Sequence, residues 1–278
     1  MSGGKIVKKN VFDVKRRVVV ITGGMGQLGR QFALSLLEQK ARVAVFDVVI
    51  SDDRIKTRFG ESSGNPDLMF CETDITDRKS IEKALKAVEN RWETPFGLVN
   101  NAAIDSPPHA PAEENGMFET YPEDSLDRIL NVNVKGQVLC CQVIGGAMAK
   151  TGRGSIINVN SIYGMVSPDQ RIYEYRRKDG KPFFKPVAYS VSKSALFNLT
   201  RYLATYWGSK NVRVNTVTFA GVFNNQDAQF LDGYLPKVPL GRMAKEDEYN
   251  GAIVFLLSDA SSYMTGANLV LDGGFTAW

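Results

Sequence analysis

The sequence predicts an α/β fold, with a doubly wound, seven-stranded parallel sheet and helices on both of its faces. Short β-branched segments alternate with segments of helical periodicity, as expected for successive β-α units. The strand segments are almost wholly apolar, which is typical of strands buried on both sides. The 278 residues show no linker, so we expect one domain over 1–278, with residues 1–11 as an N-terminal tail.

The first two elements show how the segments are distinguished. RVVVIT (17–22) is a short β-branched run, whereas the next segment carries Leu28, Phe32, Leu36 and Leu37 at helical spacing. Further strands are expected at 42–47, 68–72, 96–100, 154–160, 212–219 and 267–272. Helices are expected at 27–40, 77–93, 123–150, 188–209 and 245–258. The stretches 51–66, 104–122 and 164–187 interrupt the alternation, and long loops of this kind are usually functional or mobile.

The composition excludes several classes of protein. A net charge of +4 is too small to indicate nucleic-acid binding, and no apolar run could span a membrane or serve as a secretion signal. The cysteines Cys71, Cys140 and Cys141 form no disulfide or zinc pattern, and His109 is the single histidine, so we expect no metal site. Cys140 and Cys141 are expected to be small core residues. These features favour a cytoplasmic protein without nucleic-acid or membrane partners.

A glycine-rich segment, TGGMGQLG (22–29), follows the first strand and begins a helix. Glycines allow a tight turn beside a pyrophosphate, and the helix N-terminus supplies free N–H groups, as in Rossmann-like dinucleotide sites. Asp47 ends the second strand, where a carboxylate binds ribose hydroxyls and repels a 2′-phosphate. The cofactor is therefore expected to be NAD rather than NADP. Asp74 follows the third strand and could equally be the N-cap of the next helix.

Tyr189 and Lys193 lie at i and i+4 of a predicted helix, in the sequence YSVSK, and so share one face. A tyrosine ordinarily titrates near ~10, and a neighbouring ammonium favours its phenolate form. We therefore expect Lys193 to lower the pKa of Tyr189 and make it a proton donor and acceptor.

Several motifs occur in order along the chain: TGGMGQLG, Asp74, NNAA (100–103), NVNVKG (131–136), INVNS (157–161), YSVSK and SSYMTGANLVLDGG (261–274). Together they resemble the compact single-domain branch of the short-chain dehydrogenase/reductase family. The resemblance extends from Phe12 to Gly274. Departures from the family pattern include Gly26 before Gln27, Ala103, Phe219-Ala220 and Asn224, so the phosphate and nicotinamide loops are expected to have unusual shapes.

The resemblance implies roles for the matching residues. Tyr189 would be the catalytic acid/base, Ser161 would hydrogen-bond the substrate oxygen, and Asn133 would anchor a water that passes protons to Lys193. Lys193 would also hold the nicotinamide ribose, and Asn100 would lie against the adenosine. The expected cofactor-binding residues are Gly23, Gln27, Leu28, Gly29, Asp47, Asp74, Ile75, Asn101, Ala102, Tyr189, Lys193 and Val222. The family also implies a homo-oligomer, a tetramer or a dimer.

The stretch 164–187 is expected to be an inserted loop beside the active site, with its extra residues at about 169–186. A similar extension, with SIYG and IYE, resembles one in reductases associated with flagellin and surface-sugar modification. Arg176 and Arg177, interleaved with Tyr173, Tyr175, Phe183 and Phe184, suggest a substrate lid that binds an anionic group. A solvated insertion or an oligomer contact is the alternative.

The sequence therefore predicts hydride transfer between NAD(H) and an alcohol or ketone carbon of a polar, sugar-derived or anionic substrate. One alternative is an NADPH-dependent 3-oxoacyl thioester reductase, against which Asp47 argues. Another is a non-catalytic nucleotide-sensing protein on the same fold. The retention of Asn133, Ser161, Tyr189 and Lys193 argues against that second alternative.

Overall fold

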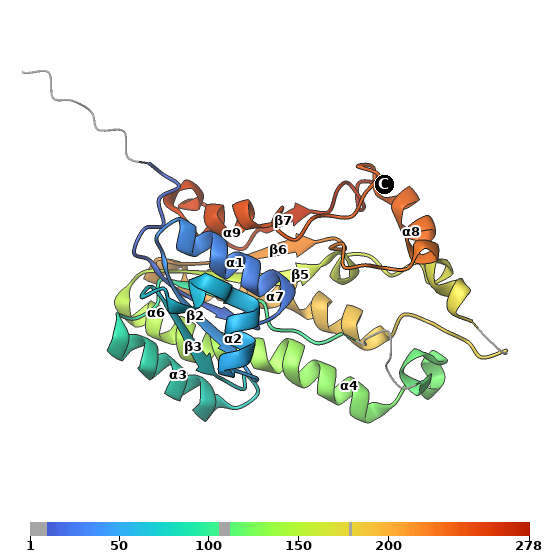
Figure 1. The fold of residues 1–278 in the computed structure, drawn as a ribbon, viewed down its shortest axis with the longest axis horizontal. Helices are drawn as coiled ribbons and strands as arrows, with labels where there is room; N and C mark the ends of the chain where they lie inside the picture. Colours follow the sequence, from blue (N-terminus) through green and yellow to red (C-terminus); the bar gives the residue numbers. More distant parts are fainter. Residues whose placement is uncertain (1–9, 106–111, 178–179) are drawn as a thin grey trace, which may run out of the picture.

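The computed structural model describes residues 10–105, 112–177 and 180–278. Residues 1–9 of the expected tail, His109, and residues 178–179 of the expected insertion lie outside the described residues. The described chain forms a seven-stranded parallel sheet in the order β3-β2-β1-β4-β5-β6-β7 (Figure 1). The strands are β1 (Val18–Thr22), β2 (Arg42–Asp47), β3 (Leu68–Glu72), β4 (Gly97–Asn100), β5 (Gly154–Ser161), β6 (Val212–Phe219) and β7 (Asn268–Leu271). The predicted fold class is confirmed.

Each face of the sheet has its own apolar core, because successive strand side chains point to opposite faces. On one face, Val19 and Ile21 pack with α1 (Gln27–Glu38) and α9 (Asn250–Leu257). On the other face, Val18 and Val20 pack with α3 (Arg78–Arg91), the long helix of residues 123–151 and α7 (Val187–Trp207). Cys140 and Cys141 are buried in this second core, as expected.

The long helix is continuous but not uniform. It consists of α4 (Glu123–Leu130), α5 (Gln137–Cys140) and α6 (Gly146–Thr151), joined by π-helical stretches at Asn131–Gly136 and Cys141–Gly145. A π-helical stretch replaces i→i−4 hydrogen bonds by a wider pattern and is frequent at functional sites. The first of these stretches carries Asn133.

Two helices were not expected from the sequence. The helix α2 (Asp52–Phe59) occupies part of the stretch 51–66, with the Ser51 hydroxyl accepting from the Arg54 N–H as its N-cap. The helix α8 (Ala228–Tyr234) follows β6, and α9 begins later than expected. Asp77, not Asp74, caps α3. Within the described part of the chain, no helix is long and apolar enough to cross a membrane.

Candidate active site

The carboxyl ends of β1, β2, β3 and β4 surround a cavity of about 460 Å³. Such a crevice, outside the strand ends of an open α/β sheet, is where ligands bind in this fold class. The helix α1 begins at its edge with Gly26 as N-cap, and no side chain caps it. Its first N–H groups are therefore available to an anionic ligand. The expected cofactor residues that line this cavity are Gly23, Gln27, Leu28, Asp47, Asp74, Ile75, Asn101 and Ala102.

Gly23 and Gly29 are required by close packing of the loop. Gly23 has φ +63°, and a Cβ atom there would lie 2.7 Å from the Ala102 Cα. A Cβ on Gly29 would lie 2.4 Å from the Gly23 carbonyl oxygen. Gly29 is not among the cavity-lining residues. The structure therefore gives a packing reason for the absence of a side chain at Gly29, and its expected contact with the cofactor stays a prediction.

Asn100 and Asn101 are adjacent but point in different directions. The Asn101 amide donates to the Thr22 and Gly23 carbonyl oxygens, at 3.0 and 3.1 Å, and so fastens the glycine loop to β4. The Asn100 amide instead donates to Asn158 Oδ1 at 2.9 Å in the core. Asn100 has no exposed surface, so its side chain does not lie where adenosine was expected.

Asp47 is held in a fixed position at the end of β2. One carboxylate oxygen accepts from the Met25 N–H at 3.0 Å and the other from the Val49 N–H at 3.4 Å. Arg54 lines the same cavity and donates to the Val49 carbonyl. The carboxylate of Asp74, by contrast, is turned toward the N–H and hydroxyl of Thr76. The Asp47 carboxylate would repel a 2′-phosphate in this cavity, whereas the Arg54 guanidinium would attract it.

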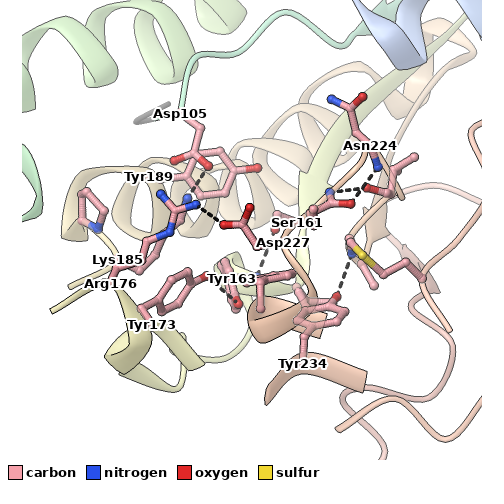
Figure 2. A pocket seen from close by; sticks show the side chains of 18 of the residues that line it. Asp105, Ser161, Tyr163, Tyr173, Arg176, Lys185, Tyr189, Asn224, Asp227 and Tyr234 are labelled. Carbon is pink, nitrogen blue, oxygen red and sulfur yellow. Dashed lines mark hydrogen bonds and ion pairs between the residues drawn. The ribbon is translucent and has the colours of Figure 1, made fainter. Parts of the chain in front are cut away.

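A second cavity, of about 630 Å³, is lined by Ser161 at the end of β5 and by Tyr189 in the first turn of α7 (Figure 2). Val222, which follows β6, lines it too. The structure thus brings Ser161 and Tyr189 together from separate elements. A hydroxyl and a phenol facing one cavity can bind and exchange a proton with a single oxygen atom.

Lys193 is buried one turn after Tyr189, and its Nζ atom donates to the Val159 carbonyl at 3.0 Å. This ammonium lies 5.7 Å from the centroid of the Tyr189 ring. Burial lowers the pKa of Lys193 to about 8. Burial, together with the negative charge of Asp105, raises the pKa of Tyr189, while Ser161 lowers it. The pKa of Tyr189 is therefore raised and not lowered as expected, because desolvation disfavours the phenolate.

Asn133 is fully buried in the first π-helical stretch. Its amide donates to the Ile104 carbonyl at 2.8 Å and to the Ser192 hydroxyl at 3.0 Å, and its oxygen accepts from the Ile104 N–H. Its side chain thus fixes the segment after β4 against α7. This places Asn133 beside the helix that carries Tyr189 and Lys193, without direct contact to the larger cavity.

The predicted insertion forms one wall of the larger cavity. Residues Gln170–Arg176 form a short helical segment, in which Ile172 and Tyr173 pack with Phe230 and Tyr234 of α8. The hydroxyls of Tyr163 and Tyr173 lie 3.3 Å apart. The two arginines expected to bind an anion are both paired within the protein. Arg176 contacts Asp227 at 2.7 Å, and Arg177 contacts Glu174 at 3.3 Å.

One hydrogen bond connects the two cavities. The Gln27 amide, at the start of α1, donates to the Phe223 carbonyl at 3.3 Å. Phe223 belongs to the segment between β6 and α8, whose neighbours Val222 and Asn224 line the larger cavity. Gln27 therefore has a connecting role in addition to its place in the glycine loop.

Among the cavity residues missed from the sequence are Arg54, Asp105, Asp227 and Tyr234. The Ser51 cap and acidic first turn of α2 could have indicated a helix that carries Arg54. No local signal marks Asp227, because its partner Arg176 lies far away in the sequence. No group of acidic, histidine and cysteine side chains that could hold a metal ion occurs among the described residues.

The sequence model of a protein family described as enoyl-(acyl carrier protein) reductase, within the short-chain dehydrogenases, matches residues 25–276. A D-threitol dehydrogenase of Mycolicibacterium smegmatis is 31% identical, over 95% of each chain. A post-translational flagellin modification protein A of Campylobacter coli is 27% identical, over 94% of this chain and 99% of its own. A short-chain dehydrogenase of Leptospira borgpetersenii, solved with bound NAD⁺, superposes with a TM-score of 0.83 at 31% identity and covers 99% of each chain.

Proposed function

Because the chain belongs to the short-chain dehydrogenase/reductase family and is an enzyme acting on CH–OH groups, we propose that it is an NAD-dependent dehydrogenase of a polar, polyhydroxylated alcohol. The observation that carries the proposal is the meeting of Ser161 and Tyr189 in one cavity, with the Lys193 ammonium behind the ring. The relative that oxidises D-threitol supports the class of substrate.

The residues around the smaller cavity fit a dinucleotide. The uncapped start of α1 offers N–H groups to a pyrophosphate, and Asp47 offers a carboxylate to ribose hydroxyls. NAD, when bound, accepts the hydride from the alcohol carbon. The similar short-chain dehydrogenase of Leptospira borgpetersenii, which was solved with bound NAD⁺, supports this choice of cofactor. We assign the preference for NAD over NADP to Asp47.

The proposed proton transfer uses residues of this chain alone. The Ser161 hydroxyl hydrogen-bonds the alcohol oxygen and holds it beside Tyr189. The Tyr189 phenolate accepts the hydroxyl proton as the C–H hydride leaves, so that an alcohol becomes a ketone and the phenol is regenerated as the acid for the reverse reaction. The Lys193 ammonium stabilises the phenolate when it forms, since it lies beside the ring. Asn133 positions α7 through Ser192 and Ile104.

The test is an oxidation screen in which turnover is measured by the near-ultraviolet absorbance of the reduced cofactor. Alditols of four to six carbons, the corresponding aldonates and simple secondary alcohols are each assayed with NAD and with NADP. Turnover of an alditol with NAD, lost in Tyr189→Phe, is the expected result. Turnover of 3-oxoacyl thioesters with NADPH, without any activity on alcohols, would contradict the proposal.

Three further properties are proposals as well. We propose that residues 1–278 form one domain, that the protein is cytoplasmic, and that it is a homo-oligomer, a dimer or a tetramer. Light scattering coupled to size-exclusion chromatography measures the assembly, and limited proteolysis checks for a single resistant unit.

A further inference from the structure

The charged side chains that line the larger cavity form two ion pairs. Among the described lining residues, these side chains are Asp105, Lys185, Arg176 and Asp227. Lys185 pairs with Asp105 and Arg176 pairs with Asp227, so the formal charges of the described lining sum to zero. The other polar side chains of the described lining are neutral hydroxyls and amides, among them those of Asn115, Tyr163, Tyr175, Asn224, Asn225 and Gln226.

The Arg176–Asp227 pair joins two elements that are distant in sequence. Arg176 ends the helical segment of the insertion, and Asp227 is the N-cap of α8. Tyr175 fixes the pair, because its hydroxyl accepts from Arg176 Nε at 2.9 Å and donates to Asp227 Oδ2 at 3.0 Å. The guanidinium also lies 5.5 Å from the Phe183 ring centroid. The pair is therefore held in one geometry at the cavity wall (Figure 2).

We propose that the Arg176–Asp227 pair makes this cavity selective for neutral, polyhydroxylated substrates and against anionic ones. A hydroxyl group both donates and accepts, so it can donate to the Asp227 carboxylate and accept from the Arg176 guanidinium. A substrate carboxylate can only accept, and it would meet the negative charge of Asp227 beside the guanidinium. This inference rests on the proposed function and deepens it by naming the class of substrate and the residues that select it.

The inference replaces the expectation that the insertion binds an anionic group. That expectation considered the arginines of residues 169–186 but not acidic partners from elsewhere in the chain. Asp227 lies 51 positions from Arg176 in the sequence, and Asp105 lies 80 from Lys185. A cation with a carboxylate at hydrogen-bond distance attracts a second carboxylate far less than a lone cation does.

The test compares kcat/KM for alditols with kcat/KM for aldonates of the same carbon number, in the unmodified protein and in Asp227→Asn. The Asp227 side chain makes no capping hydrogen bond to α8, so its replacement removes no cap from that helix. We expect the unmodified protein to favour the alditol, and Asp227→Asn to shift the ratio toward the aldonate by about tenfold, because the guanidinium then faces the substrate without its carboxylate. Arg176→Gln should shift the ratio the opposite way.

Glu174→Gln provides the matched control. It removes one negative charge from the Glu174–Arg177 pair of the same segment, and neither residue is among those lining the cavity. Its alditol-to-aldonate ratio should equal that of the unmodified protein. The inference is overturned if the unmodified protein prefers aldonates. It is also overturned if Asp227→Asn and Glu174→Gln change the alditol-to-aldonate ratio equally. If no alcohol is turned over, the proposed function fails, and calorimetric binding of the same alditols and aldonates to these variants then decides the inference.

Discussion

The two cavities are built in different ways. Around the smaller one, the glycine loop is packed closely against backbone atoms, as where Gly29 lies under the Gly23 carbonyl, and the side chains of Asp47 and Asn101 bond to backbone groups. The wall of the larger cavity is formed by side chains from distant segments, as in the Arg176–Asp227 pair. Backbone packing leaves little room for substitution, whereas a side-chain pair can be exchanged without moving the chain. A cavity with a tightly packed rim is thus joined to a cavity whose lining can vary.

The largest expected effect separates chemistry from cofactor binding. Tyr189→Phe should lower kcat/KM by about 10²- to 10⁴-fold, because phenylalanine cannot accept the substrate proton. The affinity for NAD, measured by quenching of protein fluorescence, should stay near that of the unmodified protein. A variant with most of its activity retained would show that another group transfers the proton.

The next prediction concerns the tightness of the glycine loop. Gly29→Ala should lower the free energy of unfolding by about 1–3 kcal/mol, because the added methyl group would overlap the Gly23 carbonyl. Gly146→Ala is the control in the long helix, where a Cβ meets no atom within 4 Å. It should raise stability by roughly 0.5–1 kcal/mol, since alanine favours the helix more than glycine does. Chemical denaturation measures the free energy of unfolding of both variants. Equal changes in the two variants would argue against the tight packing at Gly29.

A smaller change is expected in cofactor preference. Asp47→Ala should weaken the binding of NAD, because hydrogen bonds to the ribose are lost. The ratio of NAD affinity to NADP affinity should fall by about tenfold, because repulsion of the 2′-phosphate is lost as well. Arg54 lines the same cavity, so Asp47→Ala combined with Arg54→Ala should bind NADP less well than Asp47→Ala alone. The comparison is made by titrating each cofactor. A preference for NADP in the unmodified protein would refute the role given to Asp47.

The smallest expected effect is on the pH profile. In the proposed mechanism, alcohol oxidation requires the Tyr189 phenolate. Burial and the charge of Asp105 raise the pKa of that phenol, so kcat/KM should increase with pH above neutrality. Asp105→Asn removes a negative charge that opposes the phenolate, and the rise should move to lower pH by roughly half a unit. Lys185→Met removes a cation that lies 5.2 Å from the ring centroid, and should move the rise to higher pH. Shifts in the reverse directions would contradict the assigned charges.

The fold and the smaller cavity were largely predictable because their signals are local. Each apolar strand and the glycine segment lie within a few residues, and so does the i, i+4 pair of Tyr189 and Lys193 beside the larger cavity. The direction of the Asn100 side chain was not predictable. Asn100 ends β4 and Asn101 follows it, and only the packed structure shows that Asn100 is the one that faces the core. The helix α2 was missed because DDRIKTRF has only two apolar residues, Ile55 and Phe59, too few to show a helical period, although its capping residues were visible.

The larger cavity was less predictable because its wall depends on long-range pairing. Nothing in the sequence places Arg176 beside Asp227, since that contact requires the insertion to pack on α8 through Tyr173 and Phe230. The raised pKa of Tyr189 was also missed, because spacing shows a neighbouring cation but not the loss of water around the phenol. The π-helical stretches had no recognisable sequence signal.

The Gln27–Phe223 hydrogen bond ties the start of α1 to the segment that borders the other cavity. In the proposed function, a dinucleotide at the glycine loop would hold the start of α1, and this hydrogen bond would pass part of that restraint to the wall of the substrate cavity. Any gain in alcohol affinity that a bound dinucleotide produces would be matched by an equal gain in dinucleotide affinity from bound alcohol, because thermodynamic linkage is reciprocal.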